Sequence, residues 1–124
     1  MIELLPESKG AIVGLDVTGR IASEEEQRWI NKIQAMIDQY GKLSFLIVYH
    51  PDAHFTAAAM YEDLKWTLGH LKNINKIAIV SDSKLIKLLV HADSPFARML
   101  HIKERYFNNA ELTDAWKWIK QCEE

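Results

Sequence analysis

Two short, almost wholly apolar segments, separated by a long stretch with helical periodicity, constrain the fold of this chain more than any other feature. The segments are LSFLIVY at residues 43–49 and KIAIVS at residues 76–81. Near-continuous apolar runs of this length are typical of strands that are covered on both faces of a parallel sheet. The residues between them, from about Phe55 to Leu71, predict a connecting helix. Strands that alternate with helices indicate an α/β fold with right-handed crossovers.

The N-terminal third of the chain predicts a hairpin and a helix. MIELLPES and AIVGLDVTGRI look like two short strands joined by a turn at residues 7–10. Ser23 and Glu26 have the spacing of a capping box, which marks the start of a helix. The apolar residues of that helix recur at spacings of three and four: Trp29, Ile30, Ile33, Met36, Ile37 and Tyr40. Gly41 is expected to end it.

The C-terminal part predicts two more helices and one strand. Leu85 to Val90 indicate a helix, HIKERYF at residues 101–107 an edge strand, and Asn108 with Glu111 the cap of a last helix. That last helix has one apolar face: Leu112, Ala115, Trp116 and Ile119. We therefore expect a mixed, mostly parallel sheet of four or five strands with an N-terminal hairpin and about four helices. Residues 1–124 are expected to form a single domain.

Charge and composition argue against several classes of function. The formal net charge is −2, whereas a general nucleic-acid binder needs clustered positive charge. No stretch reaches the ~18 consecutive apolar residues of a transmembrane helix, and the N-terminal segment lacks the basic start of a signal peptide. Cys122 is the one cysteine. An internal disulfide and a thiolate metal cluster are therefore excluded, which suits a reducing cytoplasm.

The turn after the first apolar run carries the residues closest to a catalytic or metal-binding set. His50, Asp52 and His54 lie within five residues of one another in the segment IVYHPDAHFT. Two imidazoles and a carboxylate can bind zinc or act as acid and base. The segment has no H-E-x-x-H pattern and no third ligand nearby in sequence, however. We therefore interpret it as a capped turn with solvated histidines, and we expect no metal, no cofactor and no enzymatic activity.

The second predicted helix has more apolar surface than its core-facing stripe uses. We expect that stripe to consist of Met60, Leu64, Leu68 and Leu71. Other residues beside or opposite it are predicted to contact a ligand or membrane: Phe55, Ala58, Ala59 and Trp66. A helix that is apolar on two sides is either buried on both or offers a surface to a ligand, a partner or a bilayer. Burial against a neighbouring helix or in a homodimer explains the same pattern.

The third predicted helix has a similar character. Apolar residues nearly surround it, and three of them are expected to complete the ligand surface: Leu85, Leu88 and Leu89. Basic residues border it and suit an anionic headgroup: Lys84, Lys87 and Arg98. The alternative is a core helix whose lysines reach solvent at its edge.

Four segments, taken in order, resemble the SpoIIAA-like branch of the STAS superfamily, which has the anti-sigma-factor-antagonist fold. They are GLDVTGRIASEE, YEDLKWTLGHLKNINKIAIVSDSK, ADSPF and ERYFNNAELTDAWKWI, and together they cover nearly the whole chain. The resemblance implies a four- or five-stranded sheet with helices packed on it and no catalytic activity. This branch is also similar to CRAL-TRIO lipid-carrying domains, which implies a role with apolar ligands or membranes.

Regulatory STAS domains carry a phosphorylatable serine in a DSSG-like turn after the central strand. This chain has PDAHFT at that place, and Thr56 is the only hydroxyl residue there. Thr56 is therefore the candidate switch position, with a helix cap as its alternative role. Two functions follow as expectations. One is a non-enzymatic binding module for a hydrophobic or lipid-like ligand, cytoplasmic or peripheral to a membrane; the other is a protein–protein regulatory switch of the anti-sigma-factor-antagonist type.

Overall fold

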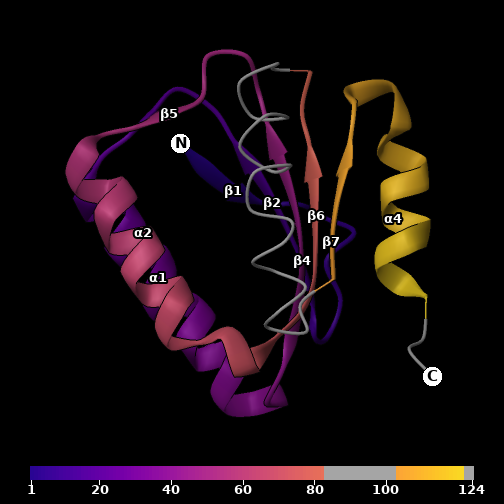
Figure 1. Ribbon diagram of the computed structural model, residues 1–124, viewed down its shortest axis with the longest axis horizontal. Coiled ribbons are helices and arrows are strands. Elements are labelled where there is room, and N and C mark those ends of the chain that lie inside the picture. Colours follow the sequence, from indigo (N-terminus) through magenta and orange to yellow (C-terminus); the bar gives the residue numbers. More distant parts are fainter. Residues whose placement is uncertain (83–102, 122–124) are drawn as a thin grey trace.

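A five-stranded sheet forms the centre of the computed structural model, which describes residues 1–82 and 103–121 (Figure 1). Its strands lie in the order β1-β2-β4-β6-β7. Their bounds are Ile2–Leu4 (β1), Ile12–Val17 (β2), Leu43–Tyr49 (β4), Ile74–Val80 (β6) and Lys103–Phe107 (β7). β1 is antiparallel to β2, and every other neighbouring pair is parallel. The predicted mixed sheet, its N-terminal hairpin and its C-terminal edge strand are thus confirmed.

Helices cover both faces of this sheet. The helices of the described residues are α1 (Ser23–Tyr40), α2 (Ala57–Gly69) and α4 (Leu112–Lys120), with 3-10 turns at η1 (Leu71–Asn73) and η2 (Asn109–Glu111). In Figure 1, α1 and α2 lie side by side on one side of the sheet and α4 lies on the other. The helix predicted at Leu85–Val90 falls outside the described residues.

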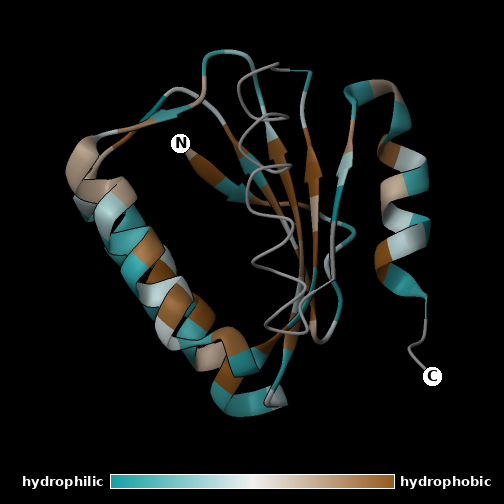
Figure 2. Ribbon diagram, in the orientation of Figure 1, coloured by the Kyte–Doolittle hydropathy of each residue, from teal (hydrophilic) through white to brown (hydrophobic). Residues whose placement is uncertain are grey.

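β4 shows why its sequence is apolar at nearly every position. Phe45 and Ile47 belong to the apolar cluster on the side of α1, whereas Leu46 and Val48 belong to the cluster that includes α4. Successive side chains of a strand point to opposite faces, so a strand buried on both faces has no polar alternation. Figure 2 shows the resulting band of hydrophobic residues along the central strands.

The two predicted capping boxes have different outcomes. The box predicted for the last helix is present at the 3-10 turn η2, which leads into α4: the Asn108 side chain and the Glu111 side chain each accept from the other residue's main chain. At α4 itself the N-cap is Glu111, and its side chain makes no capping hydrogen bond. At α1 the prediction is wrong: the N-cap is Ala22, and no side chain caps it. Ser23 is already the first helical residue, and Glu26 points into the molecule, where it is buried. Gly41 ends α1 with a φ of 83°, as predicted.

A second, two-stranded sheet sets the position at which α2 begins. β3 (Arg20–Ile21) pairs in parallel with β5 (His54–Phe55). The pairing continues one residue further, since the main-chain N–H of Thr56 donates to the oxygen of Ile21 at 2.9 Å. This small sheet was not predicted, because strands of two residues carry no periodic signal.

Candidate functional site

The outer face of α2 carries four large apolar side chains. They are exposed by 48% at Met60, 59% at Tyr61, 57% at Leu64 and 49% at Leu68. Seven large apolar residues are exposed within residues 1–82 and 103–121, and these four are the majority of them. The prediction that Met60, Leu64 and Leu68 point into the core is therefore wrong. The term "outer face of α2" refers below to these four residues.

The inner side of α2, by contrast, is small and partly polar. Ala59 is fully buried, and helical spacing places Asp63 and Trp66 on the same side. Asp63 makes a side-chain hydrogen bond with Glu26 of α1. Trp66 packs against the apolar core and stacks on His70, with 4.3 Å between the ring centroids. α2 thus presents carboxyl groups to its neighbour and apolar groups to the outside, the reverse of an ordinary surface helix.

Burial raises the pKa of Glu26 from 4.5 to about 9. Its side chain is only 4% exposed, so removal from water is the largest cause, followed by the hydrogen bond and charge of Asp63 and then by the charges of Glu62 and Glu25. Oε2 of Glu62 is also buried, without a hydrogen-bond partner among the described residues. The Glu26 carboxyl is therefore neutral at pH 7 and can donate a hydrogen bond to a second carboxyl group.

Thr56 is the N-cap of α2. Its hydroxyl oxygen accepts a hydrogen bond from the main-chain N–H of Ala59 at 3.1 Å, and its backbone is extended, with φ −64° and ψ 159°. This is the capping role that the sequence offered as the alternative to a switch position. Thr56 is partly exposed, so its hydroxyl lies near solvent at the positive end of the helix dipole.

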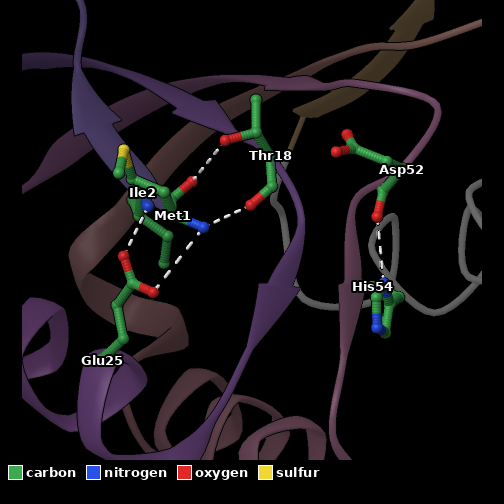
Figure 3. A network of polar contacts seen from close by, with 6 residues as sticks. All are labelled: Met1, Ile2, Thr18, Glu25, Asp52 and His54. Carbon is green, nitrogen blue, oxygen red and sulfur yellow. Dashed lines mark hydrogen bonds and ion pairs between the residues drawn. The ribbon is translucent and has the colours of Figure 1, made fainter.

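The three residues of the histidine turn do not converge. Nε2 of His50 lies 2.7 Å from Oδ1 of Asp16 at the end of β2, the strand next to β4. His54 instead contacts the main-chain oxygen of Asp52 through Nδ1 at 2.9 Å (Figure 3). Among residues 1–82 and 103–121, no group of three or more His, Cys, Asp or Glu side chains is arranged to hold a metal ion.

Sequence reasoning missed Asp16 as the partner of His50. Both residues lie at the carboxyl ends of adjacent parallel strands, β2 and β4, but the sequence predicted neither that these strands are neighbours nor that the first of them ends near Asp16. The pair joins β2 to the turn after β4, and its two side chains are partly exposed, by 43% at His50 and 29% at Asp16.

The predicted ligand-contacting residues of the second helix lie in different surroundings. Ala58 is exposed, and Ala59 is fully buried. Phe55 is half-buried and packs edge-on against Tyr49, with ring centroids 6.4 Å apart. Trp66 is half-buried on the inner side. The other predicted contacts lie outside the described residues: Lys84, Leu85, Lys87, Leu88, Leu89 and Arg98.

A polar network at the start of α1 holds the edge strand β1 (Figure 3). Oε2 of Glu25 accepts from the main-chain N–H of Ile2 at 2.6 Å, and Oε1 lies 3.7 Å from the amino group of Met1. That amino group also donates to the main-chain oxygen of Thr18. An exposed edge strand can pair with another chain through its unpaired main-chain N–H groups. Because Glu25 accepts from the N–H of Ile2, that donor is not available for such pairing.

A separate hollow of about 260 Å³ lies between the turn after β1 and the C-terminal end of α1. Its lining includes the exposed side chains of Leu4 and Tyr40, together with Met36 and Lys9. None of the residues that the sequence singled out for function lines it. Within the described residues, no helix is long and apolar enough to span a bilayer.

Comparisons with known proteins agree with this architecture. The chain matches the SpoIIAA-like family over residues 12–120. It is also similar to the crystal structure of an uncharacterized protein of the DUF3478 family, with a SpoIIAA-like fold, from Shewanella loihica PV-4. That similarity has a TM-score of 0.71 at 17% sequence identity and covers 95% of this chain and 93% of the other. A comparison with curated proteins found no match.

Proposed function

Because this chain belongs to the SpoIIAA-like family, we propose that it is a non-enzymatic binding module whose outer face of α2 contacts a hydrophobic or lipid-like ligand. The observation that carries the proposal is the exposure of four large apolar side chains on one helix face. Contiguous exposed apolar surface is uncommon on soluble proteins and usually marks an interaction site. The absence of catalysis is proposed from the general character of the family.

The energy available from this face matches reversible lipid contact. Complete burial of a large apolar side chain contributes about 1.5–3 kcal/mol, so four half-exposed side chains contribute about 3–6 kcal/mol together. An interaction of this size is weak on its own and comparable to attachment by one short acyl chain. Association with a membrane surface would thus be peripheral and reversible, in a protein that we place in the cytoplasm.

The charges on α2 suit an anionic lipid. Lys65 of α2 and Lys72 of η1 are exposed, whereas Asp63 engages Glu26 in the interface with α1. Exposed lysines beside an apolar helix face are attracted to anionic headgroups. Lys84, Lys87 and Arg98 remain predicted headgroup contacts, and the remaining predicted contacts with the acyl chain are Phe55, Ala58, Leu85, Leu88 and Leu89. Ala59 and Trp66 lie on the inner side of α2, so the predicted contact with them requires that α2 move away from its neighbour.

Co-sedimentation with vesicles tests the proposal. The probes are vesicles of phosphatidylglycerol mixed with phosphatidylcholine and vesicles of phosphatidylcholine alone. We expect Leu64→Asp and Leu68→Asp each to reduce the bound fraction on the mixed vesicles at least about tenfold, since burying a carboxylate in hydrocarbon costs several kcal/mol. Native mass spectrometry of the freshly purified chain would identify a retained lipid and would also determine whether the chain is a homodimer.

Leu4→Asp is the matched control, because Leu4 is exposed to the same degree as Leu68 but lies on β1. The proposal requires this variant to bind vesicles as the unmodified chain does. Equal binding by all three variants, or no binding by the unmodified chain, would contradict lipid contact through α2.

A protein–protein regulatory switch is the second candidate, and the position of Thr56 favours it. A phosphate on this hydroxyl would lie at the N-terminus of α2, where free main-chain N–H groups stabilise negative charge. A Thr56→Glu variant that neither gains nor loses any protein partner in pull-down experiments would argue against this candidate.

A further inference from the structure

Two carboxyl groups meet in the buried interface between α1 and α2. Glu26 of α1 is almost completely withdrawn from water and makes a side-chain hydrogen bond with Asp63 of α2. Two carboxylates have only acceptor atoms, so a hydrogen bond between them requires that one of them carry a proton. The contact therefore exists only while a proton is bound.

Within the described residues, the surroundings of the pair provide no charge that would replace that proton. The charges that act on Glu26 are those of Asp63 and Glu62 from α2 and of Glu25 from α1, and all three are acidic. From the β1 side, the Met1 ammonium lies 3.7 Å from Glu25. From β4, the side chains packed on this face of the sheet are apolar, including Phe45 and Ile47. Loss of the proton would therefore leave a buried anion among other carboxylates.

Few of its own apolar side chains hold α2 in place: the buried Ala59 and the half-buried Trp66, which packs against the core. Of residues 57–69, which the structure describes throughout, only Ala59 is fully buried, and the large apolar side chains of the outer face do not contribute to the core. Elements with few buried apolar contacts open locally at low free-energy cost. The contact with Glu26 therefore adds to a small apolar contact surface.

We propose that the Glu26–Asp63 pair is a proton-dependent latch that holds α2 against α1 and loosens as the pH rises. When α2 opens, Glu26 becomes solvated and releases its proton to water. Raising the pH therefore favours the open state. The latch does not depend on what the outer face of α2 binds.

The effect falls in an accessible pH range. The pKa of Glu26 is about 9 in the closed state and returns toward 4.5 once the residue is solvated. Between these values each opening event releases up to one proton, so the equilibrium constant for opening rises by up to about tenfold per pH unit. From pH 6 to pH 8, the protection of the α2 amides should fall by up to about a hundredfold.

Hydrogen exchange followed by mass spectrometry tests the latch on the full chain at pH 6, 7 and 8. Protection factors of α2, corrected for the intrinsic pH dependence of exchange, are compared with those of α4. In the unmodified chain we expect α2 to lose protection relative to α4 as the pH rises. Glu26→Gln should remove most of this slope, since the amide keeps a donor and has no proton to release.

Glu24→Gln is the control, because Glu24 is an exposed acid in the same first turn of α1. It should keep the slope of the unmodified chain. A flat profile in the unmodified chain, or an unchanged slope in Glu26→Gln, would overturn the latch. If Glu26→Gln does not fold, Asp63→Asn replaces it, since the amide of that variant donates to an ionised Glu26. Because Glu26 stays buried in that variant, its slope should be reduced and not abolished, since only the hydrogen bond and charge of Asp63 are removed. A slope as large as that of the unmodified chain would overturn the proposal equally.

Discussion

The ammonium group of Lys76 on β6 donates to the main-chain oxygen of Trp118 on α4, at a distance of 3.0 Å. It also donates to the oxygen of Gln121 at 2.9 Å and lies 5.1 Å from the centre of a Trp118 ring. The Lys76 side chain is only 3% exposed. A cation at the C-terminal end of a helix is favourable there, because it complements the negative end of the helix dipole and donates to the last carbonyl groups. Lys76 thus fastens α4 to the sheet.

Replacing Lys76 by Met should lower the free energy of unfolding by about 1–3 kcal/mol, because methionine keeps much of the volume but loses both charged hydrogen bonds to the end of α4. Urea denaturation followed by tryptophan fluorescence measures the change. Lys72→Met is the control, since Lys72 is exposed, and it should change stability by less than about 0.5 kcal/mol. Equal effects of the two substitutions would show that the buried contact contributes nothing.

Gly14 is required by the close approach of α4 to β2. A Cβ atom at this position would lie 2.6 Å from Cη2 and 2.9 Å from Cζ2 of Trp116, which is itself buried. Gly14→Ala should therefore destabilise the chain by about 1–3 kcal/mol, since a packed core cannot move aside without strain. Thermal unfolding provides the measurement.

The matched substitution for this test is Gly69→Ala at the C-terminal end of α2. No atom of the described residues lies within 4 Å of a Cβ added there, so alanine should be neutral or stabilising by up to about 1 kcal/mol. A Gly14→Ala variant as stable as Gly69→Ala would show that Trp116 can be displaced without cost.

The order of strands and helices could be predicted because each strand buried on both faces has a near-continuous apolar sequence. In β4, Phe45 and Leu46 are neighbours in sequence and yet pack into different clusters, on opposite faces of the sheet. Only a strand covered on both sides needs such a run. The apolar face of α4 was equally readable, and Ala115, Trp116 and Ile119 are buried as predicted.

The orientation of α2 could not be predicted, because its sequence breaks the rule on which such a prediction depends. Spacing alone favours the larger side chains of Met60, Leu64 and Leu68 as the buried stripe. The helix instead buries the small Ala59 and turns Asp63 to the buried Glu26. No sequence pattern marks an acid that will be protonated, since its pKa depends on burial by residues distant in sequence.

Thr56 should tolerate serine but not valine. Its hydroxyl oxygen caps the N–H of Ala59, and valine has nearly the same shape without an acceptor. We expect Thr56→Val to lower the free energy of unfolding by about 1 kcal/mol and Thr56→Ser to change it by less than half as much. Urea denaturation of both variants measures the difference. If Thr56→Ser loses as much stability as Thr56→Val, then the cap is not the dominant contribution of this residue.

The stability of the whole chain should also depend on Glu26 and pH. Burial raises its pKa from 4.5 to about 9 in the folded state, so between these values the folded chain binds more protons than the unfolded chain. The contribution of this group is therefore fully present below pH 4.5 and is lost as the pH rises toward 9. Glu26→Gln lacks this loss, and its stability relative to the unmodified chain should increase with pH.

The increase should reach at most about 1.4 kcal/mol per pH unit. Urea denaturation of both chains at pH 5, 7 and 8.5 measures it, and taking the difference between them cancels the titration of groups that they share. A difference that stays constant across this range would mean that Glu26 is already ionised in the folded protein. The contact with Asp63 would then have to be maintained by some group other than a shared proton.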